Sequence, residues 1–158
     1  MNTPSAPPRP ATQRGLTLIE VLIAALVLAI GLLGLASLQA ISMQFNRGAL
    51  LRTQATILAY EITDAMRANR QQALAGTYGA PPNGRTYDSG SCPEESQSDI
   101  AQDDLHGWCE RLTRQLPAGA ATIAVANDGA AEVRIRWESL RDSTCEDDEC
   151  EFTFETIL

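Results

Sequence analysis

The chain has 158 residues and a formal net charge of −8, and its basic residues are arginines with no lysine among them. This length suits one domain, and a domain this small buries only a modest core. Acidic residues are concentrated between Thr86 and Leu158. Because a negative surface repels phosphates, the composition argues against a nucleic-acid-binding protein.

Residues 1–13 are rich in Pro, Ser and Thr and have no periodic apolar residues, which predicts a disordered leader that the mature protein lacks. Arg9 and Arg14 precede the first apolar segment, and no acidic residue occurs before Glu20. Positive charge on this side predicts that the leader stays in the cytoplasm and that the rest of the chain lies outside.

An apolar segment at 21–38 follows directly on Glu20. A charged side chain at the centre of a membrane costs roughly 2.5–3.5 kcal/mol on insertion scales, so Glu20 needs a function and a positive partner. If the chain is cut between Gly15 and Leu16, the new α-amino group lies at the same depth as that carboxylate. Gly15 is then a recognition residue for the cut.

Two ordinary explanations of an N-terminal apolar segment fit less well. A secretory signal has an apolar stretch of about 7–15 residues and a small-residue cleavage site. This segment is longer, and Ala40-Ile41-Ser42 is a poor site. A plain anchor of about 20 apolar residues fits the length but gives Gly15 and Glu20 no role.

The residues around Gly15 resemble the class III signal of type IV pilins and pseudopilins. In that family a prepilin peptidase cuts after the glycine, the new N-terminal residue is methylated, and the fifth mature residue is Glu. Gly15, Leu16 and Glu20 occupy those positions, with Leu16 where the family usually has Phe. The similarity continues through residues 21–39, and its last part, 31–39, most resembles the minor pilins called PilV.

From residue 16 to about residue 74 there is no Pro, which predicts one helix roughly 90 Å long. The first half is apolar all round. The second half has an apolar face at helical spacing, formed by Leu51, Ala55, Leu58, Ile62, Ala65 and Met66. Gly31 and Gly34 fit either close helix packing in the membrane or the local unwinding that the pilin resemblance implies.

The rest of the chain predicts a surface loop at 75–92, a second helix from about Ser98 to Leu116, and three strands. Two strands, at 122–126 and 132–138, flank the turn Asn127-Asp128-Gly129, and the third contains Phe152 and Phe154. We expect an α+β, pilin-like fold in which a small antiparallel sheet and a second helix pack on the long helix. Its expected parts are a leader at 1–15, a membrane or filament-core half-helix at 16–40 and a periplasmic head at 41–158.

The four cysteines favour disulfides in an exported head over a zinc site, because they lack a Cys-x-x-Cys pair and His106 is the only histidine. Four cysteines allow three pairings. Closeness in sequence favours Cys145 with Cys150, which leaves Cys92 with Cys109.

Nothing in the sequence predicts an enzyme or a cofactor. His106 has no nucleophile motif around it, and no phosphate-binding loop is present. The acidic residues between Cys145 and Cys150 offer oxygens to calcium but lack the spacing and turn glycine of a preorganised loop, so a solvated acidic loop is the simpler interpretation.

The resemblance implies a minor pilin of the PilV type that supports pilus initiation and assembly, twitching motility and adhesion. Its partners would be prepilin peptidase, other minor pilins, the major pilin and the inner membrane. One alternative is a minor pseudopilin of type II secretion. Another, of a different class, is a membrane-anchored periplasmic protein that binds calcium or a basic ligand.

Overall fold

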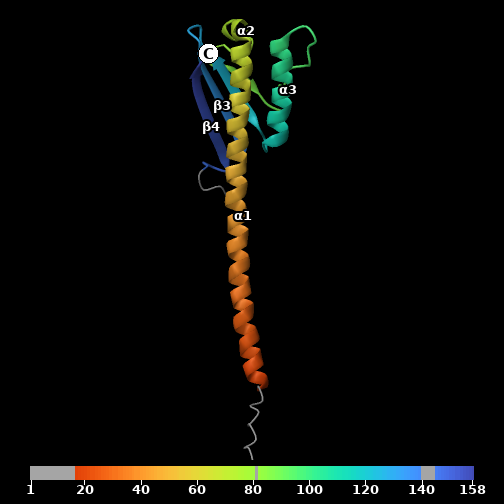
Figure 1. Cartoon of the computed structure of the whole chain (residues 1–158), viewed down its shortest axis with the longest axis vertical. Coiled ribbons are helices and arrows are strands. Elements are labelled where there is room, and N and C mark those ends of the chain that lie inside the picture. The colour runs from red at the N-terminus through yellow and green to blue at the C-terminus, as the bar shows by residue number, and fades with distance from the viewer. Residues whose placement is uncertain (1–16, 81, 140–144) are drawn as a thin grey trace, which may run out of the picture. The chain divides into compact units, whose positions relative to one another are not determined.

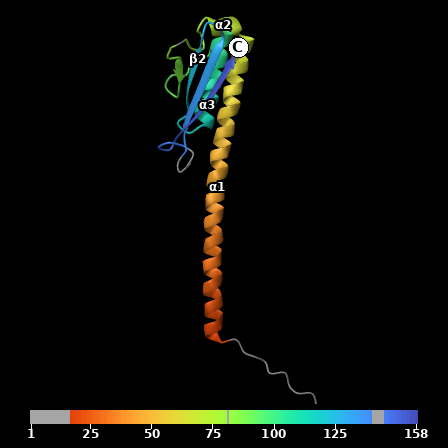
Figure 2. The same ribbon diagram turned by 90° about the vertical axis from the view of Figure 1, so that its left-hand side faces the viewer.

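The computed structural model describes residues 17–80, 82–139 and 145–158. The chain divides into two compact units, Met1–Ile41 and Ser42–Leu158. Helix α1, Leu18–Ala68, begins in the first unit and continues into the second, where the sheet and the other helices lie (Figure 1 and Figure 2).

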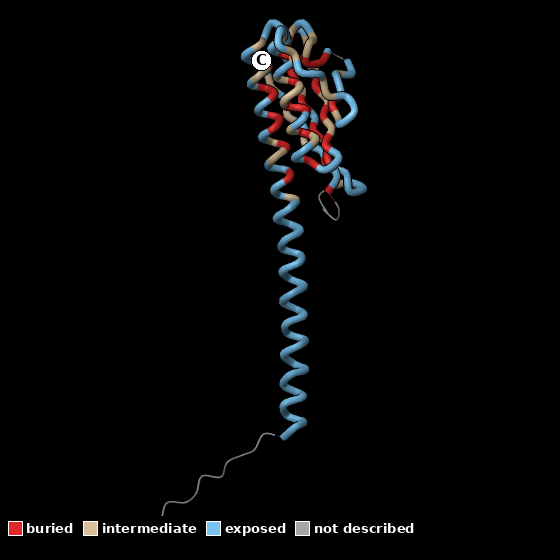
Figure 3. Tube along the Cα trace, turned by 90° about the vertical axis from the view of Figure 1, so that its right-hand side faces the viewer, coloured by how far each residue is buried: buried red, intermediate tan, exposed pale blue. Residues whose placement is uncertain are grey.

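The two parts of α1 have different surroundings. The residues that the structure describes in the first unit are all exposed, whereas one face of the helix is buried in the second unit (Figure 3). The spacing of apolar residues in the sequence predicts this face correctly, apart from Ala65, which is partly exposed. Its buried members are Leu51, Ala55, Leu58, Ala59, Ile62, Thr63 and Met66.

The helix is shorter than expected. Instead of continuing to residue 74, α1 ends at Ala68, and a separate short helix, α2, covers Arg70–Leu74. Asn69 between them has φ −110° and ψ 44°, outside the helical region. Its side-chain amide donates to Asp104 at 2.9 Å and to the Tyr78 hydroxyl at 3.4 Å. Contacts with distant residues thus accompany the break.

The segment predicted as a surface loop contains a strand and two buried tyrosines. Strand β1, Arg85–Tyr87, pairs antiparallel with β2, Ala120–Val125, and Tyr78 and Tyr87 are fully buried. The chain can approach β2 closely because Gly84 has φ +68°, and a Cβ there would lie 2.6 Å from the Ile123 carbonyl oxygen. The glycines that suggest a loop therefore also permit the pairing.

Helix α3, Ile100–Gln115, begins where the sequence predicts. The Asp99 side chain caps it by accepting hydrogen bonds from the backbone N–H groups of Ala101 and Gln102. Its buried stripe is Ala101, Leu105, Trp108, Cys109 and Leu112.

Strands β2, Ala120–Val125, β3, Ala130–Glu138, and β4, Glu149–Ile157, complete a four-stranded antiparallel sheet in the order β1-β2-β3-β4. The turn between β2 and β3 uses Gly129 at φ 91°. Along β3, buried Val133, Ile135 and Trp137 alternate with more exposed Arg134 and Arg136.

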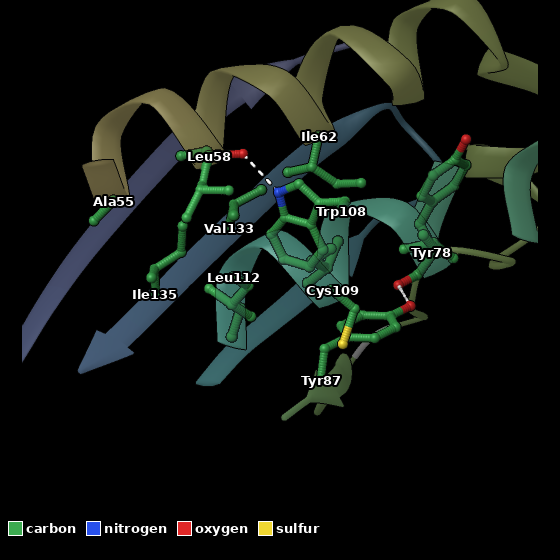
Figure 4. Close-up of a cluster of buried hydrophobic side chains, with 14 of the residues drawn as sticks. Ala55, Leu58, Ile62, Tyr78, Tyr87, Trp108, Cys109, Leu112, Val133 and Ile135 are labelled. Carbon is green, nitrogen blue, oxygen red and sulfur yellow. Dashed lines mark hydrogen bonds between the residues drawn. The ribbon is translucent and has the colours of Figure 1, made fainter. Parts of the chain in front are cut away.

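The core lies between the sheet and helices α1 and α3, as the close-up in Figure 4 shows. Leu58 and Ile62 come from α1, Trp108 from α3, and Val133 and Ile135 from the sheet. The predicted α+β fold, with a long N-terminal helix and a small antiparallel sheet, is confirmed.

Candidate functional site

The candidate site begins at the N-terminus of α1, where Thr17 acts as a cap. The backbone N–H of Glu20 lies 3.0 Å from the Thr17 carbonyl and 3.4 Å from its hydroxyl. A Thr followed three residues later by Glu is the sequence pattern of a capping box. The sequence analysis assigns no role to Thr17, although the Thr-x-x-Glu pattern predicts that it caps the helix.

Glu20 lies in the first turn of α1 and is exposed. The positive end of the helix dipole favours a carboxylate at this position by roughly 0.3–1 kcal/mol. Within residues 17–80, 82–139 and 145–158, no ion pair involves this side chain.

The helix around this carboxylate is strongly apolar. An 18-residue window in Leu18–Ala68 has a mean hydropathy of 2.8, and none of that window is buried. The helix is thus long and apolar enough to cross a membrane. Its exposed large apolar residues in the first unit are Leu18, Ile19, Val21, Leu22, Ile23, Leu26, Val27, Leu28, Ile30, Leu32, Leu33, Leu35, Leu38 and Ile41.

Gly15 and Leu16, the predicted cleavage residues, lie outside the described residues. The cut between them, and the amino group it would create near Glu20, remain predictions.

Gly31 and Gly34 lie within the continuous helix α1. A Cβ added to either glycine would meet no heavy atom within 4 Å. Packing within the single chain therefore does not require a glycine at these positions. Both explanations offered by the sequence, packing against other helices and unwinding in a filament, involve a neighbouring molecule.

The cysteines are joined as Cys92 with Cys109 and Cys145 with Cys150, the pairing that sequence proximity favours. Their Cα atoms are 5.6 Å and 4.6 Å apart, within the usual range for disulfides. The first bond ties α3 to the segment that precedes it, and Cys109 is fully buried. Cysteines bonded in this way cannot serve as thiolate ligands for zinc.

The acidic segment between Cys145 and Cys150 is a tight turn. Glu146 and Glu149 exchange backbone hydrogen bonds, while Asp147 and Asp148 have φ of 48° and 63°. Arg136 lies 3.5 Å from the Glu149 carboxylate. In the part of the chain that the structure describes, no group of three or more His, Cys, Asp or Glu side chains is arranged to hold a metal ion.

His106 has a structural partner. Its Nδ1 lies 2.8 Å from the Pro93 carbonyl oxygen, and its Nε2 lies 3.9 Å from the Glu110 carboxylate. The first contact joins α3 to the segment before it, close to the Cys92–Cys109 disulfide. This arrangement fits a packing histidine better than a catalytic base.

Comparison with protein families matches residues 10–36 to the prokaryotic N-terminal methylation motif. No curated protein and no solved structure matches the chain. The matched residues include Gly15, Leu16 and Glu20. The prepilin-like motif implies processing by a prepilin peptidase, and together with the α+β fold it supports a type IV pilin-like or pseudopilin-like protein.

Proposed function

We propose that this chain is a minor pilin of the PilV type that supports the initiation and assembly of type IV pili. In this proposal the leader at 1–15 is removed after Gly15, residues 16–40 hold the protein in the inner membrane, and residues 41–158 form a periplasmic head. The observation that carries the proposal is Glu20, a carboxylate without an ion-pair partner among the described residues, in an apolar helix that begins with a prepilin-like motif.

Assembly would transfer the apolar half-helix from lipid into a bundle of similar helices. In the bundle, Glu20 could meet the N-terminal amino group of a neighbouring subunit. In this chain the corresponding amino group is that of Leu16. A buried ion pair gives little net stability, since desolvation offsets the attraction, but it can fix the register of the subunits. Glu20 would therefore act chiefly by setting how the helices align.

The composition and disulfides of the second unit fit a location outside the cytoplasm. Two disulfides cross-link it, and its acidic residues favour solubility. In the assembled pilus it would contact other minor pilins and the major pilin, and so contribute to twitching motility and adhesion.

The test compares Glu20→Ala with Asp64→Ala on the same helix. Asp64 is a suitable control because it is exposed and its ion pair among the described residues is with Arg67, a surface contact worth little. Glu61 is less suitable because it forms a 2.6 Å ion pair with Arg111. We expect Glu20→Ala to lower the amount of the protein in sheared pili at least about tenfold, because losing one partner of a buried pair costs roughly 3–5 kcal/mol.

Membrane insertion should survive in the Glu20→Ala variant, since removing a charge makes the helix easier to hold in lipid. Immunoblots of membrane and pilus fractions, with twitching assays, would measure both steps. Normal incorporation of Glu20→Ala into pili would contradict the proposal.

A minor pseudopilin of type II secretion is the alternative, because the match at 10–36 fits both families equally. Deletion of the gene distinguishes them. Loss of twitching with normal secretion favours the minor pilin, and loss of secretion with normal twitching favours the pseudopilin.

A further inference from the structure

Strand β4 leaves one long edge of the sheet open. It pairs with β3 over nine consecutive residue pairs without a skipped residue, and no strand that the structure describes lies on its other side. The opposite edge is the three-residue strand β1. Proteins usually protect an edge strand by shortness, a bulge, a proline or charged side chains. Strand β4 is nine residues long and has neither a bulge nor a proline, but its exposed Glu151 and Glu155 are charges that discourage pairing with another acidic strand.

The backbone groups at this open edge can be identified from the sheet register. Ala130 accepts a hydrogen bond from the Ala126 N–H and so points toward β2, which makes Ala130 and Ile157 a non-hydrogen-bonded pair of β3 and β4. In antiparallel strands such pairs alternate with hydrogen-bonded ones. The β4 residues whose N–H and C=O point away from β3 are therefore Glu149, whose groups bond to Glu146, and Glu151, Thr153, Glu155 and Ile157.

Glu151, Thr153 and Glu155 have no backbone partner at the edge among the described residues. Across the described ranges, no hydrogen bond reaches the backbone N–H or C=O of Glu151, Thr153 or Glu155. An added strand could pair with them directly, as in other cases of strand addition to a sheet.

The side chains along the edge differ between the two faces of the sheet. Glu151, Thr153 and Glu155 are exposed on the outer face, whereas Phe152 and Phe154 are partly buried on the inner face. Tyr60 of α1 lies with its ring 4.8 Å from that of Phe154, and half of it is exposed. A strand beside β4 would therefore have acidic neighbours on one face and aromatic neighbours on the other.

The charges exclude a second copy of β4 as the natural occupant. Antiparallel pairing of two β4 strands centred on Thr153 would set Glu151 of one copy opposite Glu155 of the other, and like charges in that position repel. In the existing β3–β4 pairing, Glu155 lies opposite Glu132 of β3 and forms no ion pair with any described residue. The edge thus has an acidic group left to balance.

Strand β3 shows what kind of strand complements β4. Its Arg134 and Arg136 pair with Glu151 and Glu149, and Val133 and Ile135 alternate with these arginines on the buried face. We propose that the open edge of β4 binds a strand of a partner protein in which basic and apolar side chains alternate. The basic residues would face Glu151 and Glu155, and the apolar ones would lie beside Phe152 and Phe154.

This inference concerns the second unit alone and goes beyond the assembly of the N-terminal helix. The test uses the full chain in neutral detergent micelles and a fluorescent peptide containing Arg-Val-Thr-Val-Arg, with Glu-Val-Thr-Val-Glu as the matched peptide. Anisotropy should show that the arginine peptide binds more tightly. Glu155→Arg should weaken its binding about threefold to tenfold, since a favourable cross-strand pair becomes a repulsive one, and should strengthen binding of the glutamate peptide.

Glu95→Arg is the control for total charge, because Glu95 is exposed in the segment between β1 and α3. It should leave the preference between the two peptides unchanged. Equal binding of both peptides to the natural chain, or equal effects of Glu155→Arg and Glu95→Arg, would overturn the proposal.

Two further measurements test the backbone pairing itself. The amides of Thr153 and Glu155 should exchange slowly with solvent only when the arginine peptide is bound, whereas the amide of Phe154, which faces β3, should be slow in both states. Thr153→Pro removes an outward N–H and should abolish peptide binding while keeping the ladder to β3. If the exchange rate of the Thr153 amide did not change on peptide binding, pairing of the peptide with β4 would be contradicted. The same would hold if the chain alone formed a dimer and Glu155→Arg made that dimer tighter.

Discussion

The indole Nε1 of Trp108 donates a hydrogen bond of 2.9 Å to the backbone carbonyl of Leu58, which joins α3 to α1 across 50 residues of sequence (Figure 4). Both residues are 1% exposed. A buried hydrogen bond between two helices fixes their relative position as well as stabilising the core. The part of α1 around Leu58 is therefore held to α3 through this tryptophan.

Trp108→Phe should destabilise the second unit by roughly 1–3 kcal/mol, because it removes this hydrogen bond and some buried volume. Trp137→Phe is a matched control. Trp137 is equally buried, but its Nε1 has no hydrogen-bond partner among the described residues, so that substitution removes volume alone. Urea unfolding followed by circular dichroism should show the larger loss for Trp108→Phe. A greater loss for Trp137→Phe would contradict the role given to the hydrogen bond.

Elements with a strong apolar period can be predicted from this sequence. The buried face of α1, the stripe of α3 and the alternation along β3 follow from spacing alone. The break at Asn69 cannot be predicted in this way, because the side chain of Asn69 bonds to Asp104, 35 residues further along the chain, and to Tyr78 beyond α2. Strand β1 is likewise too short to show alternation, and it forms where β2 offers an edge to the residues after Gly84.

In the candidate site too, some features can be predicted from the sequence and others depend on contacts that the sequence does not show. The position of Glu20 at the start of an apolar helix is evident from the sequence, whereas the partner of its charge belongs to another molecule in our proposal. The alternation of Glu151, Phe152, Thr153 and Phe154 predicts a strand. That the strand lies at an open edge depends on the order of all four strands, which no local pattern contains.

The two disulfides should contribute unequally to stability. Their cysteines are separated by 17 and 5 residues, and closing the longer loop removes more entropy from the unfolded chain. On the chain-entropy model, the Cys92–Cys109 bond contributes about 3 kcal/mol and the Cys145–Cys150 bond about 2 kcal/mol. Replacing each pair by alanine and measuring urea unfolding should give the larger loss for the first pair. The reverse order would show that loop length does not decide the effect.

The stability of the second unit should fall at high pH because of Tyr87. Its hydroxyl donates a 2.7 Å hydrogen bond to the Tyr78 carbonyl, and burial raises the pKa of Tyr87 to about 12 despite the nearby Arg85. The unfolded chain has a tyrosine pKa of about 10. The folded state therefore keeps its proton to higher pH, so this contribution is complete below pH of about 10 and is lost as the pH rises towards 12.

Urea unfolding at several pH values between 9 and 12 would measure this loss, which should be on the order of 2 kcal/mol from Tyr87. Tyr87→Phe should reduce the pH dependence and lower stability by about 1 kcal/mol at neutral pH, where the hydrogen bond is lost. Some dependence should remain, because burial also raises the pKa of Tyr78. An unchanged pH profile in Tyr87→Phe would contradict the assignment to Tyr87.

Cleavage after Gly15 can be measured by intact-mass analysis and N-terminal sequencing of protein made in cells with and without a prepilin peptidase. With the peptidase we expect a mature chain that begins at Leu16, bears one methyl group on its amino terminus and retains the apolar half of α1. Gly15→Ala should leave more of the precursor uncut with the peptidase present. A mature terminus near Ser42, or identical masses with and without the peptidase, would contradict cleavage after Gly15 by a prepilin peptidase.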